Sequence, residues 1–257
     1  MPSSPPRLRP GLHVVRRDAT SVQVGLDPPH RVVLPADRAC LAFLESLRQG
    51  TAAEPVDDAQ ARTLHDLRRA DLLVEHPAAP RDVPTVALHH HGFAEATSRL
   101  TKMLAHVGIT VTTHPAPDLV VTCAVAPLPR ALVDPWLAEG TPHLVVAGTG
   151  RPGGLRVGPL VEPGLTACLR CIDATEAADD PRRPLLVEQL ATKVASPIEP
   201  LTLTLALAWA ARDIARFLVG DVATTWSATV DVDEPVPQVR TWLRHPECGC
   251  CWDDLPY

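Results

Sequence analysis

The cysteines in the second half of the chain form the pattern with the clearest chemical meaning. Cys168 and Cys171 are separated by two residues, and Cys248, Cys250 and Cys251 lie near the end of the chain. A Cys-x-x-Cys segment places two thiolates on one tight turn, and two such turns can complete a tetrahedral Zn²⁺ site. With four thiolates bound, no position stays open for a substrate, so the metal would be structural. The sequence therefore predicts one structural zinc ion.

The spacing leaves the fourth ligand open. Cys248 and Cys251 have the standard spacing and, with Cys168 and Cys171, form the predicted ligand set. Cys250 is the alternative to Cys251, and His245 is a minor alternative. Because 77 residues separate Cys171 from Cys248, tertiary structure must bring the two segments together.

The elements that would position these residues alternate between strand and helix patterns over 84–257. Leu119–Val125 is an uninterrupted apolar run, which is typical of a parallel strand covered on both faces. The pattern predicts a doubly wound α/β sheet. Asp173, Asp179, Asp180, Arg182 and Arg183 are expected on a solvated loop. Strands are predicted at 86–88, 109–113, 119–125, 143–146 and 157–161, helices at 94–106, 132–138 and 200–218, and a hairpin at 229–232 and 238–242.

The first 80 residues have a different pattern. Residues 1–11 are interpreted as a disordered tail, followed by short strands at 12–16, 22–26 and 31–34. Helical patterns then begin at Asp37 and at Asp57–Asp58, where aspartates can cap the helices. Three strands and two helices in this space resemble a small winged-helix module. The Pro-rich segment 76–84 is the expected linker, which gives domains at 1–80 and 84–257.

Composition excludes several classes of protein. The chain has 257 residues, of which 46% are hydrophobic, so it can bury a core. A formal net charge of −6 does not favour nucleic acid as a partner. The sequence lacks both an apolar stretch long enough for a membrane span and a signal peptide, which predicts a cytoplasmic protein.

Two segments carry a resemblance to known proteins. The segment Gly158–Cys171, GPLVEPGLTACLRC, and the closing segment His245–Cys250, HPECGC, are similar to the ThiF/MoeB-type, ubiquitin-activating-like superfamily. More narrowly, they resemble the leader-peptide-binding partner proteins of azole-forming (TOMM) cyclodehydratases. The resemblance implies a winged-helix-like RiPP recognition element followed by a degenerate Rossmann-like ThiF-type domain with a structural zinc site.

The same resemblance implies a function. Such a protein is a non-catalytic adaptor, with no catalytic residues of its own, that binds the leader of a ribosomally made precursor peptide. It would present the precursor to a YcaO-type cyclodehydratase, which forms thiazolines and oxazolines. The sequence does not identify the precursor peptide or the final product, and it does not determine whether the protein is a homodimer.

The phosphate-binding turn of the active family members is degraded here. They use G-x-G-x-x-G after the first strand, whereas this chain has His89-His90-His91-Gly92-Phe93-Ala94-Glu95. Gly92 alone matches, and Glu95 would place a negative charge near the phosphates. No ATP binding is therefore expected. The three histidines are interpreted as a polar loop, although their role is left open.

In a recognition element of this kind, the leader peptide binds as an added strand at a sheet edge. The predicted groove combines the third strand with the second helix, which carries Leu64, Leu67 and Arg68. The alternative interpretation is that these apolar positions are the small domain's own core. The proposed peptide-binding residues are Arg31, Val32, Val33, Leu34, Leu64, Leu67 and Arg68.

Two other functions compete with the adaptor. The first is an active ATP-dependent adenylating enzyme of the ThiF/MoeB type. The altered glycine turn argues against this function. A winged-helix DNA-binding regulator would need a basic recognition helix, for which Arg62, Arg68 and Arg69 give modest support.

Overall fold

The computed structural model describes residues 5–9, 11–51, 55–74, 84–233 and 236–250. The chain divides into two compact units, Met1–Arg81 and Asp82–Tyr257. The predicted domain boundary between 80 and 84 falls on residues outside the described ranges, so it stays a prediction. Cys251, the predicted fourth zinc ligand, also lies outside them.

The first unit is a three-stranded antiparallel sheet packed against two helices. Its sheet has the order β2 (Val14–Arg16), β3 (Ser21–Val24) and β4 (Val32–Pro35), so β4 lies at one edge. The helices are α1 (Arg38–Gln49) and α2 (Asp58–Arg69). Asp37 and Asp57 cap them by accepting hydrogen bonds from the N–H groups of Cys40 and Gln60, as the sequence predicts.

The start of the chain differs from the prediction of a disordered tail. β1 (Arg7–Leu8) pairs antiparallel with β5 (Leu73–Val74), the last strand of the unit. Leu8 is buried with Leu72 and Leu73 in the unit's hydrophobic core. A two-residue strand in a Pro- and Arg-rich segment has no periodicity to detect, because tertiary pairing alone orders it.

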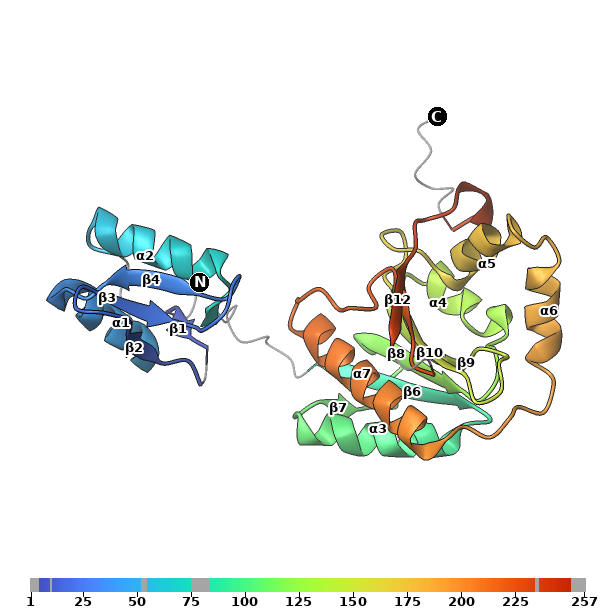
Figure 1. The fold of residues 1–257 in the computed structure, drawn as a ribbon. Coiled ribbons are helices and arrows are strands. Elements are labelled where there is room, and N and C mark those ends of the chain that lie inside the picture. The colour runs from blue at the N-terminus through green and yellow to red at the C-terminus, as the bar shows by residue number, and fades with distance from the viewer. Residues whose placement is uncertain (1–4, 10, 52–54, 75–83, 234–235, 251–257) are drawn as a thin grey trace. The chain divides into compact units, whose positions relative to one another are not determined.

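The second unit is built on a seven-stranded mixed sheet (Figure 1). Its order is β12 (Gln238–Thr241), β11 (Ala228–Asp231), β10 (Leu155–Val161), β9 (His143–Gly148), β8 (Leu119–Ala124), β6 (Thr85–His91) and β7 (Thr110–Val111). The strands from β9 to β7 are parallel, whereas β10, β11 and β12 extend the sheet antiparallel. The predicted doubly wound sheet is thus a mixed α/β sheet, and the predicted C-terminal hairpin is present as β11 and β12.

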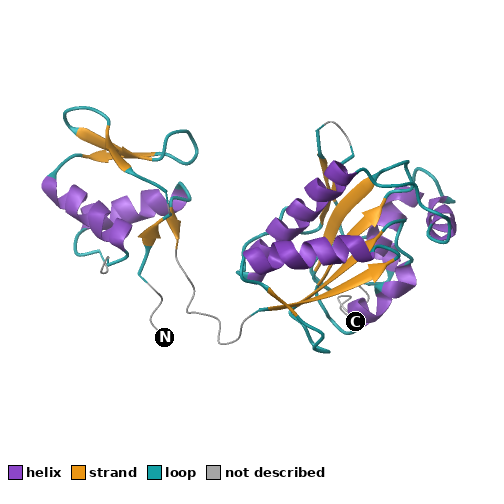
Figure 2. Ribbon diagram, turned by 90° about the horizontal axis from the view of Figure 1, so that it is seen from below, coloured by secondary structure: helices purple, strands orange, loops and turns teal. Residues whose placement is uncertain are grey.

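Helices cover both faces of this sheet. α3 (Ala94–His106) and α7 (Pro200–Leu218) lie side by side on one face (Figure 2). The other face carries η1 (Arg130–Leu132), α4 (Asp134–Ala138), α5 (Leu169–Ala177) and α6 (Arg183–Leu190) (Figure 1). η2 (Pro246–Cys248) follows the last strand. None of the described helices is both long and apolar enough to cross a bilayer.

One glycine in β10 fixes the path toward the first cysteine pair. Gly158 has φ 94°, and a Cβ there would lie 2.4 Å from the carbonyl oxygen of Ala228 on the neighbouring strand. Only glycine allows this close approach. The register of β10 against β9 shifts between Val157 and Leu160, so the strand end turns toward Cys168.

Candidate functional site

The first cysteine pair lies at the start of α5. Cys168 is the residue that precedes the helix and Cys171 is in its first turn, so the two thiols project from the same side. Both are buried against strands β8, β9 and β10, together with Leu169 and Ile172. The apolar residues of α5 thus hold the pair rigidly against the sheet.

The second pair reaches the first through the last strand. After β12, the Trp242 side chain is buried in the same cluster, and its Nε1–H donates to the Thr229 hydroxyl at 2.9 Å. The chain then enters η2, where Cys248 and Cys250 flank Gly249, whose φ is 83°. This left-handed turn directs both sulfurs toward α5.

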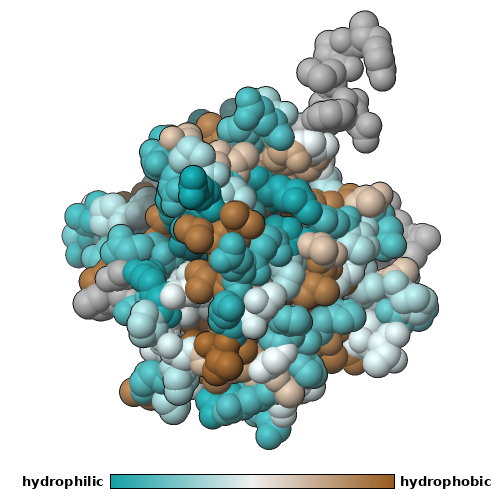
Figure 3. Space-filling view, turned by 90° about the vertical axis from the view of Figure 1, so that its right-hand side faces the viewer, coloured by the Kyte–Doolittle hydropathy of each residue, from teal (hydrophilic) through white to brown (hydrophobic). Residues whose placement is uncertain are grey.

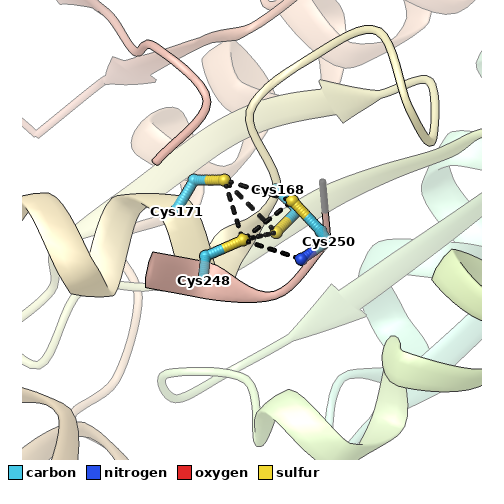
Figure 4. A group of neighbouring side chains, drawn as sticks. All are labelled: Cys168, Cys171, Cys248 and Cys250. Atoms are coloured by element: carbon cyan, nitrogen blue, oxygen red, sulfur yellow. Dashed lines mark hydrogen bonds between the residues drawn. The ribbon is translucent and has the colours of Figure 1, made fainter. Parts of the chain in front are cut away.

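The four sulfur atoms lie within 4.8 Å of one another (Figure 4). The Sγ atom of Cys168 is 3.7 Å from Cys171 and 3.8 Å from Cys248, and Cys171 is 3.4 Å from Cys250. Four ligands about 2.3 Å from a tetrahedral zinc ion lie roughly 3.8 Å apart. Both Cys168 distances match this spacing, whereas Cys171–Cys248 at 3.2 Å and Cys248–Cys250 at 2.8 Å are shorter, so these sulfurs would have to move apart to hold an ion. Four thiolates are the donor set that zinc favours.

Of the first cysteine pair, Cys168 and Cys171, the second is the one whose ionised form is favoured. A hydrogen bond from Cys168 lowers the pKa of Cys171 and raises that of Cys168. Burial raises the pKa of Cys248. The backbone N–H of His245 also donates to the Cys171 sulfur at 3.3 Å. A cluster of four thiols held in this way is stabilised when a divalent cation replaces the protons.

The ring of His245 has another role. Its Nδ1 accepts a hydrogen bond from the N–H of Glu247 at 3.2 Å and so caps η2. Among the described residues, Cys250 supplies the fourth thiol beside Cys168, Cys171 and Cys248.

An ion pair that the sequence did not indicate supports α5. Asp173, predicted on a solvated loop, is instead a buried residue of α5, and both its oxygens accept from Arg130 at 2.6 and 2.7 Å. The side chains of Asp173 and Arg130 are only 11% and 12% exposed. The prediction failed because 43 residues separate the partners, and only the fold brings η1 against α5.

The turn after β6 makes its contacts with the end of β8. Gly92, with φ 70°, follows β6 and forms an isolated bridge with Ala124 at the end of β8. The Val125 N–H donates to the His91 carbonyl, and the Val125 side chain lies 3.4 Å from where a Gly92 Cβ would be. At the start of α3, Glu95 forms an ion pair with Arg99. The turn that follows the first parallel strand therefore has a carboxylate in the first turn of its helix, where a phosphate-binding turn has glycine.

The predicted histidine loop is the end of strand β6. His89, His90 and His91 are all exposed, and the His89 ring packs 5.6 Å from that of Trp136. The described residues contain no group of three potential ligands around them.

The outer edge of β4 has a defined set of backbone groups. The Ala36 N–H donates to the Thr20 carbonyl at 2.8 Å, and Leu34 is paired with Val22. Because hydrogen-bonded pairs alternate along an antiparallel ladder, the N–H and C=O of Val33 point away from β3. Pro35 also faces outward, where its missing N–H costs no ladder bond. No described strand extends the sheet beyond β4.

The side chains near this edge fall into two groups. Arg31, Val33 and Arg68 are exposed, and Val33 retains 44% of its side-chain exposure. Val32, Leu34, Leu64 and Leu67 are buried with one another in the core of the unit. The two α2 leucines were predicted to line the groove, but the structure places them in the core, because a unit of this size needs its few large apolar side chains inside.

Comparison with known proteins supports the fold. No family model and no curated protein sequence matches the chain. Among solved structures, the heterocyclase TruD matches with a TM-score of 0.69 and 19% identity, over 97% of this chain and 43% of TruD. A heterocyclase in complex with substrate and cofactor matches with a TM-score of 0.68 and 18% identity, over 99% of this chain and 40% of that one.

A third match covers nearly the whole of both chains. MccB from E. coli, bound to ATP, has a TM-score of 0.58 and 12% identity, and the match covers 96% of this chain and 99% of MccB. The comparisons confirm the fold. The chain shares its fold with these proteins, and it spans about two fifths of the two heterocyclases. At these identities the comparisons show the fold alone.

Proposed function

We propose that this protein is a non-catalytic adaptor that binds the leader of a ribosomally made precursor peptide and presents it to a separate YcaO-type cyclodehydratase. The observation that carries the proposal is the outer edge of β4. This edge has no neighbouring strand among the described residues. It belongs to a chain of which nearly the whole length matches the fold of part of two heterocyclases.

The leader would add as a strand beside β4. The outward N–H and C=O of Val33 offer one pair of main-chain hydrogen bonds, and Arg31 would pair with an acidic leader residue. Pro35 ends the run of available donors, so it limits how far the leader can pair. Contacts with Val32, Leu34, Leu64 and Leu67 would be indirect, through the buried core that holds β4 in place.

The four-cysteine cluster would bind a structural Zn²⁺ through Cys168, Cys171, Cys248 and Cys250. Its role is to join the segment after β12 to α5. Two of the thiols are buried, and closure by four protein thiolates leaves the metal without a position for substrate.

The adaptor function is supported by the altered turn at Gly92. Phosphate binding at a helix N-terminus needs backbone N–H groups that a ligand can approach closely. Here Val125 packs over Gly92, and Glu95 adds a negative charge. ATP-dependent chemistry would then belong to the partner enzyme.

A single substitution tests the proposed strand edge. Val33→Pro removes the outward amide at a position where proline fits an edge strand, as Pro35 already does. In fluorescence anisotropy with the labelled cognate leader, affinity should fall by at least about tenfold. Val33→Thr keeps the amide and should bind within about twofold of the native protein.

A matched control lies on the other free edge. Val239 of β12 is 51% exposed, and its amide also points outward, because Trp242 N–H donates to Ser227 and Arg240 pairs with Thr229. Val239→Pro should leave leader binding unchanged. Equal loss of affinity in both proline variants, or none in either, would count against binding at β4.

The second candidate function is adenylation, which the match to ATP-bound MccB favours. An adenylating enzyme would exchange pyrophosphate into ATP in the presence of its peptide. We expect no exchange by this protein alone, and robust exchange would replace the adaptor proposal with this second function.

A further inference from the structure

An apolar groove lies between α3 and α7, and three of its residues, Met103, Ala211 and Ala215, are only partly buried against the core. It is lined by Met103 and Val107 on the α3 side and by Ala208, Ala211, Ala215 and Val219 on the α7 side, with Arg212 and Arg216 beside them. These two helices are outermost on their face of the sheet, and no other described element covers them (Figure 2).

The groove belongs to a second apolar stripe on α7. The inward stripe packs on the sheet through residues such as Leu203, Leu207 and Ile214. The outward stripe contains Leu201, which is 75% exposed, and Leu205, and it ends at Val219, which is 63% exposed. A helix at the surface of a single domain usually has polar residues there. The apolar outward stripe therefore indicates a surface that a partner covers.

Charge restricts what the partner can be. Residues 82–257 contain 20 Asp and Glu against 13 Lys and Arg, yet the groove has two arginines. The only acidic residue of α7, Asp213, is buried and accepts hydrogen bonds from Thr224 and Thr225. Beside the groove, Arg212 is exposed and Arg216 is half-buried. An acidic group of the partner would pair with the exposed guanidinium of Arg212.

The alanines restrict its shape. Ala208, Ala211 and Ala215 lie at helical spacing and leave room for another helix to approach closely. A second copy of this chain would bring the same arginines against each other, which opposes self-association through this groove. The complementary partner is an amphipathic helix with an apolar stripe and acidic residues beside it.

We propose that the α3–α7 groove docks an acidic amphipathic helix of the separate cyclodehydratase. The inference rests on the proposed function. The matched part of TruD is 43% of one continuous polypeptide, whereas an adaptor that is separate from its enzyme must hold it through a surface. This groove is such a surface: its alanines allow a helix to approach closely, and its arginines favour an acidic partner.

Two charge changes in the groove test the proposal. Ala208 and Arg212 are exposed, so Ala208→Glu and Arg212→Glu should fold normally. Biolayer interferometry would measure the affinity of the full-length protein for the YcaO-type cyclodehydratase of the same organism. Each variant should weaken binding by at least about tenfold, and the native affinity should fall as salt rises.

The matched control is Leu186→Glu. Leu186 is an exposed apolar residue of α6. α6 lies on the side of the second unit that Figure 3 turns toward the viewer, where hydrophobic and hydrophilic residues are interspersed. This variant should bind like the native protein. Metal content and thermal unfolding of all three variants should equal those of the native protein.

Three outcomes would overturn the proposal: native-like binding by both groove variants, loss of binding in Leu186→Glu alone, or a native dimer that Ala208→Glu converts to a monomer. The last would assign the groove to a second copy. Leader affinity, measured on the same samples, tests the proposed function separately, because β4 lies in the other unit.

Discussion

Replacing Cys171 by serine should release the metal and destabilise the second unit alone. Structural zinc sites contribute an apparent binding free energy of about 10–16 kcal/mol, shared here among four thiolates. Loss of one ligand should therefore cost roughly 2.5–4 kcal/mol, which weakens zinc binding by about two to three orders of magnitude. For a unit of this size, the melting temperature should fall by roughly 5–15 °C.

The sequence provides a selective assay. All five tryptophans lie in residues 82–257 and none in the first unit. Tryptophan fluorescence therefore reports unfolding of the second unit, and mass spectrometry of the metal gives its stoichiometry. The native protein should hold about one Zn²⁺ per chain.

The other cysteines supply the controls. Cys40 lies in α1 and belongs to the core of the first unit, so Cys40→Ser should keep the metal and the native tryptophan transition. Cys250→Ser should behave like Cys171→Ser, whereas Cys251→Ser should keep its zinc if Cys250 is the fourth ligand. A native protein that is folded without metal, or a Cys171→Ser variant with unchanged zinc content and melting temperature, would refute the reasoning.

Three further predictions concern stability and nucleotide binding. Asp173→Ala leaves the buried Arg130 unpaired and should lower the free energy of unfolding by about 3–5 kcal/mol in urea titrations, whereas Arg170→Ala, which breaks the exposed pair with Asp134, should cost no more than about 1 kcal/mol. Hydrogen bonds from Ser21 and Thr20 lower the pKa of Asp18 from 3.8 to about 2. The folded state therefore favours the ionised carboxylate of Asp18. Its contribution to folding stability is complete above pH 3.8 and is lost as pH falls through about 2. In acid titrations followed by circular dichroism, Asp18→Ala should remove this part of the pH dependence of unfolding. Calorimetry with MgATP should show no binding to the native protein, and micromolar binding would contradict the interpretation that the turn at Gly92 has lost its phosphate site.

Local patterns predicted most of the fold. The apolar run at Leu119–Val125 became β8, and the helical pattern at 94–106 became α3, because hydrophobic periodicity reflects burial directly. The aspartate caps of α1 and α2 were also visible in the sequence. The sequence analysis did not predict α5 or α6. In α5 the buried Asp173 interrupts the apolar pattern, because its partner Arg130 is distant in the sequence. In α6 several leucines are exposed, so the apolar residues do not mark the buried face.

The candidate sites were predicted unevenly for the same reason. The cysteine pairs are local motifs, so their meeting could be expected before the fold was known. The choice of Cys250 depends on the left-handed turn at Gly249, which the spacing alone does not specify. Leu64 and Leu67 follow the pattern of both a core and a groove, and only their burial assigns them to the core.

Reconstitution with the partner enzyme tests the adaptor function most directly. The precursor, the YcaO-type cyclodehydratase of the same organism and ATP would be combined with and without the protein. Mass spectrometry would count the water molecules lost from the core peptide. The account predicts rapid loss of water only when the enzyme, this protein and a precursor with its leader are all present, and none from this protein and ATP alone. Equal rates without the protein, or ATP-dependent modification by the protein alone, would contradict it.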